Sequence, residues 1–170
     1  MSKSVKYLLF MLITAVYSGA LSAETVSIKV SKNITSVAEY RLGEPNKPLL
    51  IFVHGFLQTR AFSTVDRLLN SLHDGGFPVL APTLSLGISN RAQALPCESI
   101  HLHSLNSDTD ELGRWVEWAN KRGYKEIVLI GHSAGSVNIS AYLAGKIHPA
   151  VKKSILISLT HYGPDRPAAF

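Results

Sequence analysis

The chain has 170 residues, of which 46% are hydrophobic, and it carries 17 Lys and Arg against 12 Asp and Glu. This length is enough for one domain with a substantial core, and its basic residues do not cluster with aromatic side chains, so we expect no nucleic-acid partner. The single cysteine, Cys97, excludes an intramolecular disulfide, and we expect its thiol to be buried.

The first 23 residues have the pattern of a secretory signal peptide. Lys3 and Lys6 form a basic start, residues 7–16 form an apolar core, and small residues follow. Cleavage after Ala20, Ser22 or Ala23 fits this pattern. Because the apolar core is shorter than the ~20 residues that span a bilayer, we expect export to the periplasm or the cell exterior, with no stable membrane span after cleavage. Residues 24–170 then form one domain with 15 basic and 12 acidic residues and a formal charge of +3.

Strands and helices are expected to alternate along the rest of the chain. Alternating or continuous apolar runs predict strands over 25–30, 37–42, 48–53, 78–82, 126–130 and 153–160. Apolar residues at helical spacing predict helices over 61–73, 107–122 and 134–146. Trp115 is expected on the core face of its helix and Trp118 near the edge of that face. This order predicts an α/β fold, with a mostly parallel sheet and helices on both of its faces.

Residues 131–135, Gly-His-Ser-Ala-Gly, join an apolar strand to an alanine-rich helix. The pattern G-x-S-x-G at such a junction forms a turn that is too tight for side chains at its flanking positions. The turn holds the hydroxyl of Ser133 exposed at the end of the sheet, and it therefore predicts a nucleophilic serine.

A second motif, His54-Gly55-Phe56, directly follows the apolar strand at 48–53. With both motifs in this order and at this separation, residues 49–160 resemble the α/β-hydrolase family. The resemblance implies that backbone N–H groups stabilise an oxyanion during catalysis. One of these donors is the N–H of Ala134, and the other is that of Phe56, with Leu57 as the neighbouring alternative. His54 is expected to brace its loop by hydrogen bonds rather than to act in catalysis.

Few residues after Ser133 could complete a catalytic triad with an acid and a histidine. The family order is Ser, then Asp or Glu, then His, and Asp165 is the one acidic residue after Ser133. A minority of the family has its triad acid at the position of Asp165, after the strand that follows the nucleophile helix. The alternative is that Asp165 is a turn residue without a catalytic role. His148 is expected at the opposite end of the sheet, and His161 precedes Asp165 rather than following it. The general base is therefore expected to be a histidine absent from this chain.

Residues 84–106 are the least regular part of the sequence and contain Cys97, His101 and His103. Their spacing matches no familiar zinc signature, so we expect no metal site. We expect instead a surface segment that covers the mouth of the active site and shapes substrate access.

The family has eight strands, and its last strands have no counterpart here, so we expect this chain to be the N-terminal part of a longer hydrolase. The expected function is an exported carboxylic ester hydrolase that acts on small-molecule or lipid esters without a cofactor. Two alternatives remain open. One is a hydrolase-like binding protein without a working triad, and the other is a fragment with no function of its own.

Overall fold

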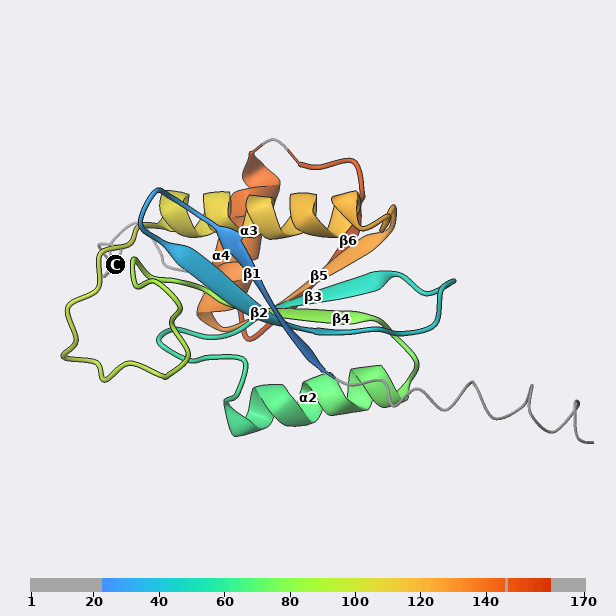
Figure 1. The fold of residues 1–170 in the computed structure, drawn as a ribbon, viewed down its shortest axis with the longest axis horizontal. Helices are drawn as coiled ribbons and strands as arrows, with labels where there is room; N and C mark the ends of the chain where they lie inside the picture. The colour runs from blue at the N-terminus through green and yellow to red at the C-terminus, as the bar shows by residue number, and fades with distance from the viewer. Residues whose placement is uncertain (1–22, 146, 160–170) are drawn as a thin grey trace, which may run out of the picture.

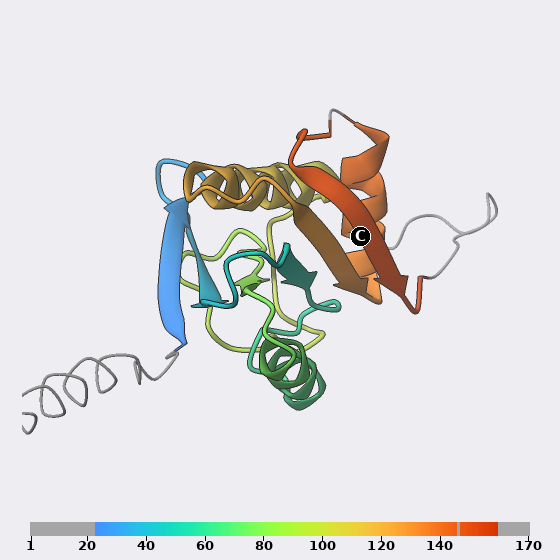
Figure 2. The same cartoon turned by 90° about the vertical axis from the view of Figure 1, so that its right-hand side faces the viewer.

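The computed structural model describes residues 23–145 and 147–159 and shows a three-layered α/β arrangement around one sheet. The strands are β1 (Glu24–Lys29), β2 (Thr35–Arg41), β3 (Leu49–Val53), β4 (Val79–Thr83), β5 (Ile127–His132) and β6 (Val151–Ile157). The helices are α2 (Ser63–Asp74), α3 (Leu105–Lys121) and α4 (Ala134–Ala144). Helix α2 covers one face of the sheet, and α3 and α4 cover the other (Figures 1 and 2). The predicted signal peptide lies outside the described residues, apart from residue 23.

The strand order is β1-β2-β4-β3-β5-β6. β2 pairs antiparallel with both β1 and β4, whereas β4, β3, β5 and β6 run parallel to one another. The mostly parallel sheet predicted from the alternation of elements is therefore confirmed. In the described part of the chain β6 forms one edge of the sheet, where Ile155 and Ile157 are 50% and 37% exposed.

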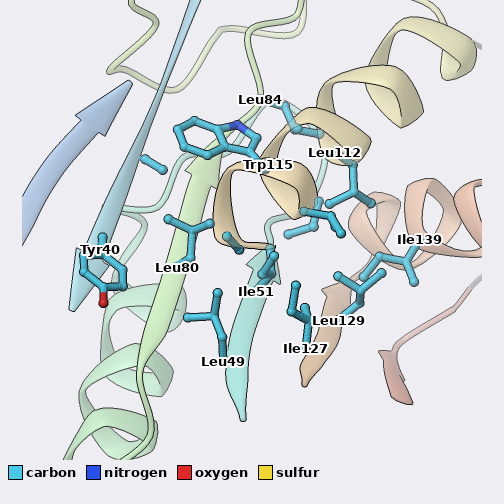
Figure 3. Close-up of a cluster of buried hydrophobic side chains, with 14 of the residues drawn as sticks. Tyr40, Leu49, Ile51, Leu80, Leu84, Leu112, Trp115, Ile127, Leu129 and Ile139 are labelled. Atoms are coloured by element: carbon cyan, nitrogen blue, oxygen red, sulfur yellow. The ribbon is translucent and has the colours of Figure 1, made fainter. Parts of the chain in front are cut away.

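Burial on both faces explains why β3 is a continuous apolar run. Leu49 and Ile51 face α3 and α4, where they join a core that includes Trp115 (Figure 3). Leu50 and Phe52 point to the other face and pack with the apolar side of α2. Successive side chains of a strand alternate between the two faces of a sheet, so a strand that is covered on both faces needs apolar residues throughout.

The bounds of most elements differ by one to three residues from those predicted; strand β6, for example, covers Val151–Ile157 rather than 153–160. Helix α3 begins at Leu105 rather than at residue 107, because Ser104 caps it: the Ser104 hydroxyl accepts from the Ser107 N–H at 3.2 Å, and Ser107 Oγ accepts from the Ser104 N–H at 2.8 Å. Strand β5 continues two residues further, through His132. Cys97 is exposed, so its expected burial was wrong. It lies in the irregular segment, where no helix or strand covers it.

The described helices include none that is both long enough and apolar enough to cross a membrane.

Candidate active site

Ser133 occupies a strained turn between β5 and α4. Its backbone has φ 54° and ψ −121°, a conformation that residues with a side chain rarely adopt. Two hydrogen bonds hold the turn: the Ser133 N–H donates to the Ile157 carbonyl at 2.9 Å, and the Ser136 N–H donates to the Ser133 carbonyl at 2.9 Å. Such strain persists only where the surrounding structure enforces it, and it concentrates at functional sites.

The two glycines of the G-x-S-x-G motif are sterically required. A Cβ at Gly135 would overlap the backbone oxygens of Val53 and His54, because the start of α4 packs directly on the end of β3. A Cβ at Gly131 would lie 2.7 Å from backbone atoms of Gly135. The absence of these side chains lets the helix approach the sheet and places Ser133 at the carboxyl end of the parallel strands.

A small cavity of about 270 Å³ lies beside this turn. Both predicted oxyanion-hole residues, Phe56 and Ala134, line it, as does the alternative donor Leu57. Ala134 is the first residue of α4. The first N–H groups of a helix have no acceptor within the helix and carry a partial positive charge, which suits a developing oxyanion. The remaining walls are mainly apolar and include Leu84, Leu86 and Val137.

His54 braces the loop that carries Phe56. Its Nδ1 donates to the Gly55 carbonyl at 2.8 Å, and its Nε2 accepts from the Leu84 N–H at 3.1 Å and faces an Arg91 guanidinium nitrogen at 3.3 Å. Burial lowers the pKa of His54 to about 4, and the positive charge of Arg91 acts in the same direction, whereas the bond to Gly55 opposes them. The imidazole is therefore neutral at pH 7. This geometry agrees with the expected structural role of His54.

Arg91 is a buried residue whose role no sequence pattern indicated. Its guanidinium donates to the carbonyls of Leu84 at 2.6 Å, Gln58 at 2.8 Å and Gln93 at 3.1 Å. Burial lowers its pKa to about 10, so it stays charged at pH 7, helped by the nearby negative charge of Glu111. Arg91 thereby ties the loop after β3 to the segment after β4.

Glu111 fixes the same segment from the side of α3. Its buried carboxylate accepts from Ser36 Oγ at 2.6 Å and from the N–H and hydroxyl of Ser85 at 2.9 and 2.5 Å. Burial raises the pKa of Glu111, and the hydrogen bonds from Ser36 and Ser85 oppose this rise. No sequence pattern indicated this bridge from α3 to β2 and residue 85.

The two ends of the irregular segment 84–106 line the cavity, and the effect of the segment on substrate access stays a prediction. His103 and Ser104 line the cavity, and the ring centroids of His101 and His103 lie 5.6 and 6.4 Å from that of Phe56. His103 Nδ1 donates to Asp108 Oδ2 at 2.8 Å. Burial raises the pKa of Asp108, and His103 is the main group that opposes this rise. The described residues contain no group of three potential metal ligands, and Cys97 lies exposed.

The structure does not describe the candidate triad partners of Ser133. Asp165 and His161 lie outside the described residues. His148 follows the far end of α4, where it lies 3.4 Å from a Glu117 oxygen and lines a separate cavity of about 440 Å³. In the described part of the chain, the hydroxyl of Ser133 has no hydrogen-bond partner.

The strand order and the turn between β5 and α4 define an α/β fold with a mostly parallel sheet. The model of the Alpha/beta hydrolase family matches residues 50–170, and the chain belongs to this family. No curated protein sequence matches the chain significantly.

Several solved structures share this fold at low sequence identity. The α/β hydrolase GrgF from Penicillium sp. sh18 is 17% identical with a TM-score of 0.65, over 82% of this chain and 46% of its own. Est1E from Butyrivibrio proteoclasticus is 20% identical with a TM-score of 0.56, and the match covers 72% of this chain and 46% of Est1E. A cold-adapted esterase from an Arctic intertidal metagenomic library is 13% identical with a TM-score of 0.64, over 79% and 59%. The chain thus spans about half the length of these structures.

Proposed function

We propose that this protein is an exported serine hydrolase that cleaves carboxylic esters with Ser133 as nucleophile. The observation that carries the proposal is the strained turn of Ser133 beside a cavity lined by Phe56 and Ala134. One of the solved structures named above is a cold-adapted esterase, which favours ester substrates over the other chemistries that this fold supports. The signal-peptide pattern of residues 1–23 supports export.

The proposed reaction has two stages. Ser133 Oγ attacks the ester carbonyl carbon while its proton passes to a histidine base, and the carbonyl oxygen becomes an oxyanion. The N–H groups of Ala134 and Phe56 bind this oxyanion, each contributing about 3 kcal/mol to transition-state stabilisation. Collapse of the intermediate releases the alcohol and leaves an acyl-serine, which water then hydrolyses. In the family order the base follows Ser133, and Asp165 is the candidate acid that orients it.

The cavity favours short acyl groups. Its volume of about 270 Å³ lies near the lower end of the range for small-molecule sites, and its walls are mainly apolar. A long lipid chain would have to extend beyond it.

Hydrolysis of p-nitrophenyl butyrate by the full-length mature protein tests this proposal. We expect Ser133→Ala to lower kcat by at least about 1000-fold, because removal of the nucleophile leaves only the contribution of binding and of the oxyanion hole. Ser140→Ala is a matched control, since Ser140 lies on the same helix and its hydroxyl donates to the Ser136 carbonyl at 2.8 Å. A folded wild-type protein without activity above Ser133→Ala would contradict the proposal and favour a hydrolase-like binding protein.

A further inference from the structure

Five polar side chains line the cavity beside Ser133, namely His54, His103, Ser104, Asp108 and Asn138. His54 and Ser104 are hydrogen-bonded to neighbouring backbone groups. His103 enters from the irregular segment and Asn138 from α4, and both line the cavity with Ala134. Asn138 is only 8% exposed. A polar side chain is rarely buried in an apolar surrounding unless it has a hydrogen-bond partner.

Neither His103 nor Asn138 has its hydrogen-bonding capacity filled by the part of the chain that the structure describes. Within residues 23–145 and 147–159, the amide of Asn138 makes no side-chain hydrogen bond, and Nε2 of His103 makes none either. The same residues contain no fully buried side-chain nitrogen or oxygen without a partner. The unpartnered atoms of His103 and Asn138 therefore keep accessible surface, and both residues line the cavity.

Asp108 fixes the orientation of His103. The bond of 2.8 Å between His103 Nδ1 and Asp108 Oδ2 directs one ring nitrogen to the carboxylate, and the Asp108 side chain is only 6% exposed. In the neutral imidazole, a proton on Nδ1 leaves Nε2 as an acceptor. The ring of His101 packs on His103 with centroids 5.0 Å apart and further restricts it. The cavity thus presents a preoriented acceptor together with an amide that both donates and accepts.

We propose that His103 and Asn138 form a subsite for a hydroxyl group on the bound substrate. A hydroxyl both donates and accepts, so its chemistry matches an imidazole nitrogen and an amide that line the same cavity. This inference rests on the proposed function, because it makes the acyl group of the ester a short hydroxyacyl chain.

The charges around the subsite favour a hydroxyl over a carboxylate. Asp108 lines the cavity next to His103, so a ligand carboxylate would lie beside a second carboxyl group, which disfavours it. The positive charge of Arg91 already faces Glu111 as well as Asp108, and its guanidinium is occupied by backbone carbonyls. A plain alkyl chain would remove water from His103 and Asn138 and leave both without partners, a loss that such sites discriminate against strongly.

Binding of two uncharged amides to the full-length mature protein tests the subsite. Butyramide and 3-hydroxybutyramide differ by one hydroxyl, and titration of 15N-histidine-labelled Ser133→Ala protein by imidazole NMR reports both the affinity and the nitrogen that responds. We expect 3-hydroxybutyramide to bind about tenfold more tightly and to shift the resonance of His103 Nε2. His103→Phe and Asn138→Leu should each abolish the preference. His101→Phe should keep it, because His101 does not line the cavity and phenylalanine retains a ring that can pack on His103.

Equal affinity for the two amides, or a preference that survives in both His103→Phe and Asn138→Leu, would overturn the subsite. Circular dichroism of each variant shows that a loss of preference does not come from unfolding. The readout needs no hydrolysis, so it separates the two proposals. A protein that prefers the hydroxylated amide but lacks esterase activity would retain the subsite and refute the proposed function.

Discussion

Arg91 and His54 meet beneath the candidate active site, with a guanidinium nitrogen of Arg91 3.3 Å from Nε2 of His54. Both side chains are buried, at 3% exposure each. A positive charge beside the ring disfavours protonation of His54, and the ring in turn offers the guanidinium an acceptor. This contact joins the loop that carries Phe56 to the irregular segment after β4. The same pair of side chains therefore holds both the proposed oxyanion-hole loop and the segment that lines the cavity.

Replacing Arg91 should therefore destabilise the whole fold. Arg91→Ala leaves the carbonyls of Leu84 and Gln58 without their donor, and we expect the free energy of unfolding to fall by about 3 kcal/mol. The free energy of unfolding of Arg91→Lys should lie between those of Arg91→Ala and the wild type. An ammonium group cannot donate to several carbonyls in the planar geometry of a guanidinium. Urea unfolding measures both. A loss of less than about 0.5 kcal/mol in Arg91→Ala, a size usual for exposed sites, would show that these contacts carry little stability.

His54 should make the protein less stable in acid. Its folded pKa of about 4 lies below the ordinary value of 6.5, so the unfolded state takes up a proton first as the pH falls. Neutral His54 makes its full contribution to the free energy of unfolding above pH 6.5. This contribution falls by about 3 kcal/mol between pH 6.5 and 4.

The difference in free energy of unfolding between the wild type and His54→Gln isolates this effect. The pKa of Glu111 is raised, so this group makes the folded state relatively more stable as the pH falls. The effect is the same in both proteins and therefore cancels from the difference. We expect the difference to shrink by about 3 kcal/mol between pH 7.5 and 4. Titration of His54 near pH 6.5 in an NMR experiment on the folded protein would contradict the prediction.

The regular elements could be predicted because their sequence signals are local. The apolar runs of β3 and β5 and the glycines around Ser133 specify strands and a tight turn without reference to the rest of the chain. The start of α3 was placed two residues late because Ser107 occupies the position where a capping box usually has Glu or Gln.

The polar support of the site could not be predicted in the same way. Arg91 contacts a carbonyl 33 residues earlier in the chain, and Glu111 contacts Ser36 across 75 residues. Neither contact follows a helical or strand period, so no local pattern indicates it. The pair His103 and Asp108 lies close in sequence, but its meaning depends on the cavity, which forms only when β3, α3 and α4 pack together.

Replacing Gly135 or Gly113 by alanine should have opposite effects on the stability of the fold. In Gly135→Ala the new Cβ overlaps backbone oxygens at the end of β3, and we expect a loss of more than about 3 kcal/mol or failure to fold. Gly113 lies inside α3, where a Cβ would meet only Tyr142 Cε2 at 3.5 Å, an ordinary contact. Gly113→Ala should stabilise by up to about 1 kcal/mol through higher helix propensity. Thermal melting of the two variants compares them directly, and equal shifts would argue against the close approach of α4 to β3.

The most direct test of the central claim is to locate the site of a covalent fluorophosphonate adduct. The probe reacts with activated serines, and peptide mass spectrometry of the labelled full-length protein identifies the residue. We predict one adduct, on Ser133, which is absent from Ser133→Ala and retained in Ser140→Ala. An adduct on another serine, or no adduct on a folded wild-type protein, would contradict the assignment of Ser133 as nucleophile.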